Sequence, residues 1–114
     1  STATTLITTT DPVRIAEDYA YVQHLTGGRV DLTLGRGNTG PVYPWFGQDI
    51  RKGIEIAIEN YDLLRRLWTE DVVNWEGQFR TPLQQFTSTP RPLDGQKWRL
   101  RARRRKDREG STIR

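Results

Sequence analysis

The pattern of apolar and polar positions along the chain predicts strands that alternate with helices. Residues 2–9 form an uncharged run rich in β-branched side chains, which is typical of a buried strand. Residues 29–34 alternate in polarity and predict a second, short strand. A helix is expected to begin between them at Asp11-Pro12, because Asp can cap free backbone N–H groups and Pro suits the first helical position. We expect it to end at Gly27-Gly28, because glycine readily adopts the left-handed conformation that terminates helices.

The clearest element is a second helix over residues 50–68. Apolar residues recur there at alternating steps of four and three, which places them on one face of a helix. The members of this stripe are Ile50, Ile54, Ala57, Tyr61, Leu64 and Trp68. We expect the stripe to pack against the strand at 30–34, because both elements otherwise leave an apolar face unburied.

The segments on either side of this helix predict loops and a small hairpin. Residues 35–40 form a glycine-rich loop, and residues 41–46 mix prolines with aromatics in a way that is not expected to be helical. After the helix, residues 72–75 and 78–80 predict two hairpin strands. Three later prolines predict an extended stretch.

The order strand, helix, strand, helix with short connections predicts parallel strands and an α/β fold. Two strands do not make a stable sheet alone, so further strands must complete it. With 114 residues the chain is one domain at most. Only 34% of its residues are apolar and its mean hydropathy is −0.75, so it is more polar than most independent domains.

Charge divides the chain into two parts. Residues 97–114 contain nine Lys or Arg against two acidic residues, a net charge of +7. The other 96 residues contain nine basic and twelve acidic residues, a net charge of −3. We therefore expect a body at 1–96 and a basic tail at 97–114 that is irregular or disordered and contributes little to stability.

Several kinds of site are excluded by composition. The chain has no Cys and a single histidine, His24, so a disulfide framework, a thiolate nucleophile and a His-rich metal site are not expected. No apolar run is long enough to cross a membrane, and no signal-peptide pattern opens the chain. We expect a cytoplasmic protein, and we interpret His24 as a surface or capping residue.

A series of short motifs in a fixed order resembles the luciferase-like, flavin-dependent monooxygenases. The motifs are Thr2-Ala3, Asp11-Pro12-Val13-Arg14 with Ala16-Glu17-Asp18, Leu25-Thr26-Gly27-Gly28-Arg29, Gly35-Arg36-Gly37, Phe46-Gly47, the helix around 61–68, and the Trp75-Glu76-Gly77 turn. Together they cover Thr2 to Gly95 and correspond to the third and fourth β-α units of a (β/α)8 (TIM) barrel. The tail departs from the family pattern, which is typical of a truncation, a frameshift or an engineered end.

The resemblance implies an α/β fold that is part of a TIM barrel, and a flavin cofactor. The parent reaction would transfer one oxygen atom from O2 to an organic substrate with reduced FMN; some relatives use a deazaflavin instead. The implied cofactor-binding residues are Arg36, Gly35, Gly37, Asn38, Ala3 and Thr4. No catalytic residue and no metal ligand is identified.

Each of these residues also has a simpler interpretation. A barrel of this type places its active site at the carboxyl ends of the strands, where Arg36 would meet the flavin phosphate or ring. The alternative is a solvated Arg in a surface turn. Ala3 and Thr4 fall where the family often has a non-prolyl cis peptide beneath the ring, and the alternative is an ordinary trans strand. Trp45, Trp68 and Trp75 are interpreted as packing residues, and the alternative for Trp45 is stacking on a ligand.

Two functions of other classes remain open at this point. The first is nucleic-acid binding by the basic tail around Trp98, although we do not expect nucleic acid as a partner. The second is a protein without activity that persists as a homo-oligomer, because part of a barrel exposes sheet edges that invite pairing. For the isolated chain we expect weak FMN binding and no monooxygenase turnover.

Overall fold

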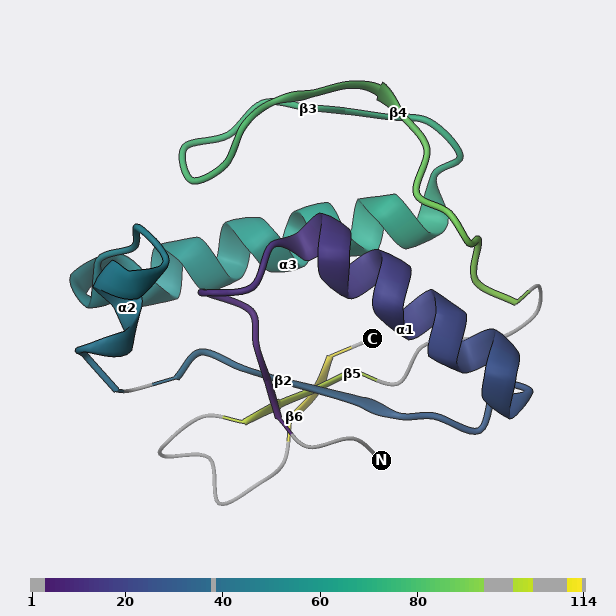
Figure 1. Cartoon of the computed structure of the whole chain (residues 1–114), viewed down its shortest axis with the longest axis horizontal. Helices are drawn as coiled ribbons and strands as arrows, with labels where there is room; N and C mark the ends of the chain where they lie inside the picture. Colours follow the sequence, from purple (N-terminus) through teal and green to yellow (C-terminus); the bar gives the residue numbers. More distant parts are fainter. Residues whose placement is uncertain (1–3, 38, 94–99, 104–110, 114) are drawn as a thin grey trace.

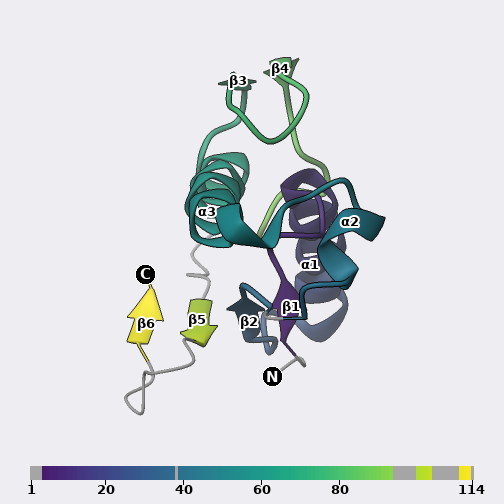
Figure 2. The ribbon, with the colours of Figure 1, turned by 90° about the vertical axis from the view of Figure 1, so that its left-hand side faces the viewer.

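The computed structural model describes residues 4–37 and 39–93, together with the backbone of residues 100–103 and 111–113. The elements are β1 (Thr5–Leu6), α1 (Pro12–Thr26), β2 (Leu32–Gly35), α2 (Val42–Trp45), a 3-10 turn at Ile50–Lys52, α3 (Gly53–Thr69), β3 (Val73–Trp75), β4 (Leu83–Phe86), β5 (Leu100–Arg103) and β6 (Ser111–Ile113). They form three layers, with α1 and α3 between a four-stranded sheet and the β3–β4 hairpin (Figures 1 and 2). The alternation of strands and helices predicted from the sequence is confirmed.

The larger sheet has the strand order β1-β2-β5-β6. Strand β2 pairs in parallel with β1 on one side and with β5 on the other, which confirms the predicted parallel arrangement. Strand β6 pairs antiparallel with β5 at the sheet edge. The basic tail therefore contains two short strands, whereas an irregular or disordered tail had been expected with a short strand as the alternative.

Strand β1 ends at Leu6, earlier than the predicted strand over residues 2–9, of which residues 2 and 3 lie outside the described residues. The backbone bends after Leu6 into a turn in which Thr10 N–H donates to the Leu6 carbonyl, 3.1 Å away. The pairing with β2 extends only one bond further, from Ile7 N–H to the Gly35 carbonyl at 2.9 Å. The side chain of Asn60 on α3 holds this turn, because its amide donates to the Ile7 carbonyl at 2.8 Å.

Helix α1 has the ends that the sequence predicts. The Asp11 side chain accepts a hydrogen bond from Val13 N–H, and Pro12 is the first helical residue. At the other end Gly27 adopts a left-handed conformation with φ 62°, and its neighbour Gly28 has φ 82°. These local signals determine both boundaries of the helix.

The buried face of α3 differs from the predicted stripe. Leu64 and Trp68 belong to the core with Leu32 and Leu34, and Ala57 and Tyr61 pack at its margin, so part of the prediction is confirmed. The amino-terminal part is wrong. Ile50 and Ile54 are exposed, and the buried positions include Gly53, Ile56, Asn60, Leu63 and Leu67.

The reason lies in two non-aliphatic residues on the buried face, Gly53 and Asn60. Gly53 lets the helix start approach Tyr43, whose hydroxyl would lie 3.2 Å from a Cβ at this position. Asn60 is buried because its amide bonds the turn after β1. A pattern of aliphatic residues alone does not show either contact.

The hairpin and the segment before α3 also differ from prediction. Strand β4 lies at 83–86, not at 78–80, because the N–H groups of Gln78 and Phe79 donate to the Glu59 carboxylate at 2.8 and 3.0 Å. These N–H groups are therefore not paired with β3. Residues 42–45 form a single helical turn, which tolerates Pro44 because the first turn of a helix has no backbone acceptor for that N–H.

Candidate functional site

The carboxyl ends of β1 and β2 lie side by side. Thr5 is paired with Leu34 and Leu6 with Gly35, so the chain leaves both strands at the same edge of the sheet. This is the edge at which parallel α/β structures place their ligands. The threonine run at 8–10 and the loop that follows Gly35 are thereby brought together.

Buried hydroxyl groups hold the start of this loop in place. The Thr8 Oγ1 atom lies 2.5 Å from the Arg36 carbonyl oxygen and 3.1 Å from Tyr43 Oη. Tyr43 Oη lies 2.6 Å from the Arg36 carbonyl and 3.1 Å from the Gly37 carbonyl. Thr8 and Tyr43 are each 1% exposed. The backbone at Arg36 and Gly37 is therefore fixed by side chains from two other segments.

Gly35 and Gly37, the two glycines of the loop, exclude a larger side chain for different physical reasons. A Cβ at Gly35 would lie 2.5 Å from the Thr4 methyl group, so Thr4 and Gly35 are in direct contact. Gly37 has φ 76°, which favours glycine, and a Cβ there would also lie 3.3 Å from Leu6. Four of the predicted site residues, Thr4, Gly35, Arg36 and Gly37, are thus neighbours. Ala3 and Asn38 lie outside the described residues.

The side chain of Arg36 is exposed, but its stem is held. A Cβ at Gly53 would lie 3.4 Å from Arg36 Cδ, which shows how closely the Arg stem follows the start of α3. No hydrogen bond or ion pair of its guanidinium is found within the described part of the chain. The group therefore offers its donors to solvent or to a ligand.

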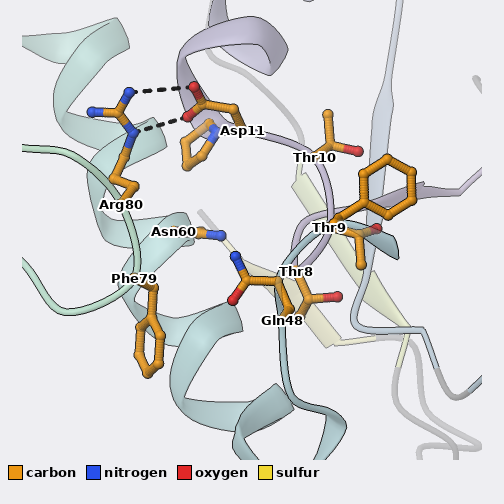
Figure 3. A pocket seen from close by; sticks show the side chains of 10 residues that line it. Thr8, Thr9, Thr10, Asp11, Gln48, Asn60, Phe79 and Arg80 are labelled. Atoms are coloured by element: carbon orange, nitrogen blue, oxygen red, sulfur yellow. Dashed lines mark hydrogen bonds and ion pairs between the residues drawn. The ribbon is translucent and has the colours of Figure 1, made fainter. Parts of the chain in front are cut away.

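A small pocket of about 180 Å³ lies beside the threonine run (Figure 3). Its lining residues are Thr8, Thr9, Thr10, Asp11, Pro12, Phe46, Gln48, Asn60, Phe79 and Arg80. Typical ligand pockets hold roughly 300–1,000 Å³, so this one is too small to enclose a flavin. Thr8 lines the pocket and also contacts the Arg36 carbonyl, so the pocket and the glycine loop share one wall.

The charges at this pocket are paired. Arg80 Nε and Nη2 donate to the two carboxylate oxygens of Asp11 at 3.0 and 3.3 Å, in the fork geometry shown in Figure 3. Asp11 also caps α1, so the ion pair joins the hairpin side of the pocket to the start of a helix. Asn60 and Arg80 were not predicted from the sequence, because their roles depend on contacts with residues distant in sequence.

Other residues considered from the sequence lie elsewhere. His24 is exposed, and its Nε2 hydrogen bonds with the Arg91 carbonyl, which agrees with a surface or capping role. Trp68 and Trp75 are buried, as expected for packing residues, whereas Trp45 is 74% exposed and the packing interpretation is wrong for it. Within the described residues no group of three or more acidic or histidine side chains is placed to hold a metal ion. No helix in this part of the chain is long and apolar enough to cross a membrane.

The shifted pKa values belong to surface pairs and to one partly buried tyrosine. Hydrogen bonds from Arg51 lower the pKa of the Asp49 carboxyl, and the same pair raises the pKa of Arg51. A hydrogen bond from Arg66 likewise lowers the pKa of Glu70. Burial raises the pKa of the Tyr61 hydroxyl.

Comparison with known proteins places this arrangement in a family. The sequence profile of the luciferase-like monooxygenases matches residues 1–99. No curated protein matches the chain. Among solved structures, the monooxygenase RslO1 from Streptomyces bottropensis is similar with a TM-score of 0.80 and 26% identity, over 88% of this chain and 30% of that one.

A second solved structure shares the fold. It is an F420-dependent secondary alcohol dehydrogenase in complex with an F420-acetone adduct, with a TM-score of 0.63 and 22% identity over 79% of this chain and 27% of that one. The chain thus spans less than a third of the length of these proteins. The family profile covers most of the chain, and the α/β arrangement agrees with it: the chain belongs to the luciferase-like monooxygenase family.

Proposed function

We propose that this chain is a segment of a cytoplasmic, flavin-dependent oxidoreductase that uses FMN and O2 to transfer one oxygen atom to an organic substrate. In this proposal the β-α-β-α unit is part of a (β/α)8 barrel and supplies one wall of the cofactor site. The observation that carries it is the convergence of the fixed Gly35–Gly37 loop with the end of β1, in a chain of this family.

The residues present are compatible with a flavin at this wall. Arg36 would meet the phosphate or the ring edge, because its guanidinium is exposed, has no partner among the described residues and is held at its stem by α3. Gly35 and Gly37 would allow close approach of the backbone. Thr4, in contact with Gly35, would lie beside them, and by resemblance Ala3 and Asn38 would complete this wall.

The protein's part in the reaction follows from these contacts. Bound reduced flavin supplies the electrons for oxygen chemistry, whereas the protein binds, orients and shields it. Thr8 and Tyr43 keep the Arg36 backbone fixed, so that the guanidinium is presented from one place. The small pocket next to Thr8 is too small for the cofactor and would admit only a small polar group or water.

A deazaflavin is the second candidate cofactor. The observation that favours it is the shared fold with an F420-dependent alcohol dehydrogenase. In that case the reaction would be hydride transfer and not oxygen transfer. A parallel titration with a deazaflavin and with FMN separates the two candidates.

The test is a titration of FMN into the ¹⁵N-labelled chain, followed by NMR. One wall of a site cannot offset the entropy of immobilising the cofactor, so we expect a dissociation constant on the order of 0.1 mM or weaker, and no turnover. The shifts should centre on the amides of Gly35, Arg36 and Gly37. Arg36→Ala should weaken binding about tenfold, whereas the matched control Arg65→Ala, an exposed Arg on α3, should not.

Two outcomes would contradict the proposed site. Amide shifts spread over the surface without a centre at 35–37 would show that the loop is not a flavin wall. Binding that is unaffected by Arg36→Ala would show that the phosphate is held elsewhere.

A further inference from the structure

Gly53, the first residue of α3, is buried where the helix meets the loop that follows β2. Its backbone has φ −56° and ψ −38°, which is ordinary helical geometry. Any residue adopts this conformation, and alanine favours a helix more than glycine does. The backbone conformation therefore does not require glycine at this position.

The neighbours of Gly53, and not its backbone, restrict what can occupy this position. A Cβ here would lie 3.2 Å from Tyr43 Oη, 3.4 Å from Arg36 Cδ and 3.6 Å from Arg36 Cγ. Carbon atoms in favourable contact lie about 3.5–4.0 Å apart, so an added methyl group would displace at least one of these neighbours. Both neighbours belong to the arrangement that presents the Arg36 guanidinium.

The two neighbours differ in how easily they can move. Tyr43 is 1% exposed, and its hydroxyl lies 2.6 to 3.1 Å from three oxygen atoms of the chain. The Arg36 side chain is exposed, and no hydrogen bond of its guanidinium is found among the described residues. A methyl group at residue 53 would therefore move the Arg36 stem and leave Tyr43 in place.

The packing of α3 prevents the helix itself from moving away. Asn60, seven residues after Gly53, lies two turns later on the same face of the helix. It is 6% exposed and donates to the Ile7 carbonyl at 2.8 Å. Leu63 and Leu64, in the next turn, are fully buried. The start of α3 is thus held against the loop.

We propose that Gly53 is a positioning residue for the cofactor: because it has no side chain, the Arg36 stem can follow the helix and the guanidinium is held in one place. This inference rests on the proposed function, in which Arg36 meets the flavin phosphate or ring edge. Bidentate arginine contacts require donors placed to within about 0.5 Å. A displacement of the stem at Cδ grows toward the end of the side chain and weakens such contacts.

A double-mutant cycle of FMN affinity, measured by NMR titration of the full chain, tests the inference. Gly53→Ala should weaken binding roughly threefold to fivefold, less than the loss of the whole side chain in Arg36→Ala. The double variant should bind no more weakly than Arg36→Ala, because the methyl group then has no arginine to displace. A merely structural role of Gly53 would weaken binding by the same factor in both backgrounds.

The chain without flavin gives a second readout and a matched control. Gly53→Ala should shift the Arg36 Nε–Hε signal in the NMR spectrum and leave the melting temperature nearly unchanged. Gly40→Ala adds the same methyl group to the same loop, but its Cβ would lie 3.8 Å from Ile50 Cδ1, an ordinary contact. This control should change neither the Arg36 signal nor the FMN affinity.

The outcomes separate the role of Gly53 from the proposed cofactor wall. An unchanged FMN affinity in Arg36→Ala would contradict the wall itself, and the inference with it. Weaker binding in Arg36→Ala together with unchanged binding in Gly53→Ala would contradict only the role of Gly53. Equal factors in both backgrounds or an unmoved Arg36 signal would also overturn it. So would a Gly53→Ala chain that does not fold, because Tyr43 and not Arg36 would then oppose the methyl group.

Discussion

Gly37 is the residue at which backbone conformation and packing are both restrictive. Its φ of 76° is unfavourable for other residues, and a Cβ would contact Leu6 at 3.3 Å. We predict that Gly37→Ala destabilises the fold by about 2–3 kcal/mol, of which about 1–2 kcal/mol reflects the left-handed conformation. Urea unfolding followed by circular dichroism measures this change.

Gly47 provides the control for Gly37. It has a similar φ of 71°, but nothing lies within 4 Å of its Cβ position. Gly47→Ala should therefore cost only the backbone part, about 1–2 kcal/mol. Equal losses in the two variants would mean that Leu6 does not restrict the loop.

The Arg66–Glu70 pair gives a pH-dependent prediction. The hydrogen bond from Arg66 lowers the pKa of Glu70, so the contact stabilises the fold fully above the ordinary glutamate pKa. The stabilisation is lost as the pH falls through the lowered pKa. Arg66→Gln should raise the pKa of Glu70 toward its ordinary value, as measured by NMR titration of the side-chain carboxyl carbon. Arg65→Gln is the control, and an unchanged Glu70 midpoint in Arg66→Gln would refute the assignment.

The single residues that the sequence analysis identified correctly are those with local causes. Asp11 caps the start of α1 and Gly27 terminates it. Both act through contacts within a few residues, so their roles could be predicted. Asn60 and Arg80 act across 53 and 69 residues of sequence, on Ile7 and Asp11. Nothing near them in sequence indicates these partners, and their place beside the threonine run emerges only from the fold.

At the scale of elements, Glu59 joins the hairpin to α3. Its carboxylate accepts from the N–H groups of Gln78 and Phe79, both of which would otherwise need another acceptor. We predict that Glu59→Ala destabilises the fold by about 1–3 kcal/mol and speeds hydrogen exchange at these two amides. The exchange rates of the amides in the interior of α3, measured by NMR in the same experiment, should be unchanged.

Glu55 is the matched control for Glu59. It is an exposed carboxylate one turn earlier on the same helix, and no hydrogen bond to the hairpin is found for it within the described residues. Glu55→Ala should leave exchange at Gln78 and Phe79 unchanged. If both variants accelerate exchange equally, the hairpin is not held by Glu59.

Elements differed in how far the sequence determined them. The boundaries of α1 were predictable because capping is local, and the parallel strand order followed from the alternation of strands and helices. The face of α3 was predicted wrongly at its start, because apolar residues lie on opposite sides of the helix and periodicity does not say which side is buried. The position of β4 was missed because Glu59 takes the amides of the expected strand.

At the scale of the whole molecule, the parallel sheet explains why the candidate site exists at all. The pairing of β1 with β2 aligns two chain exits, and α3 holds one of them through Asn60 and meets the other at Gly53. The family resemblance identified the residues of this edge, whereas composition and periodicity alone gave only an α/β unit. A site that is formed by several strands thus contains only the residues of the strands that this chain supplies.

The last prediction concerns the basic tail, which the sequence suggested is dispensable. In the structure β5, at 100–103, pairs with all four residues of β2, and β2 carries the buried Leu32 and Leu34. Removing residues 97–114 would leave this strand without its outer neighbour and expose an edge. We therefore expect that deletion to lower the melting temperature by about 5 °C or more and to promote aggregation. A chain ending at Arg103 is the control: it keeps β5, loses the net charge of +3 that residues 104–114 carry, and should retain most of the stability. Equal melting temperatures for the full chain and the chain ending at residue 96 would show instead that β2 is stable without β5.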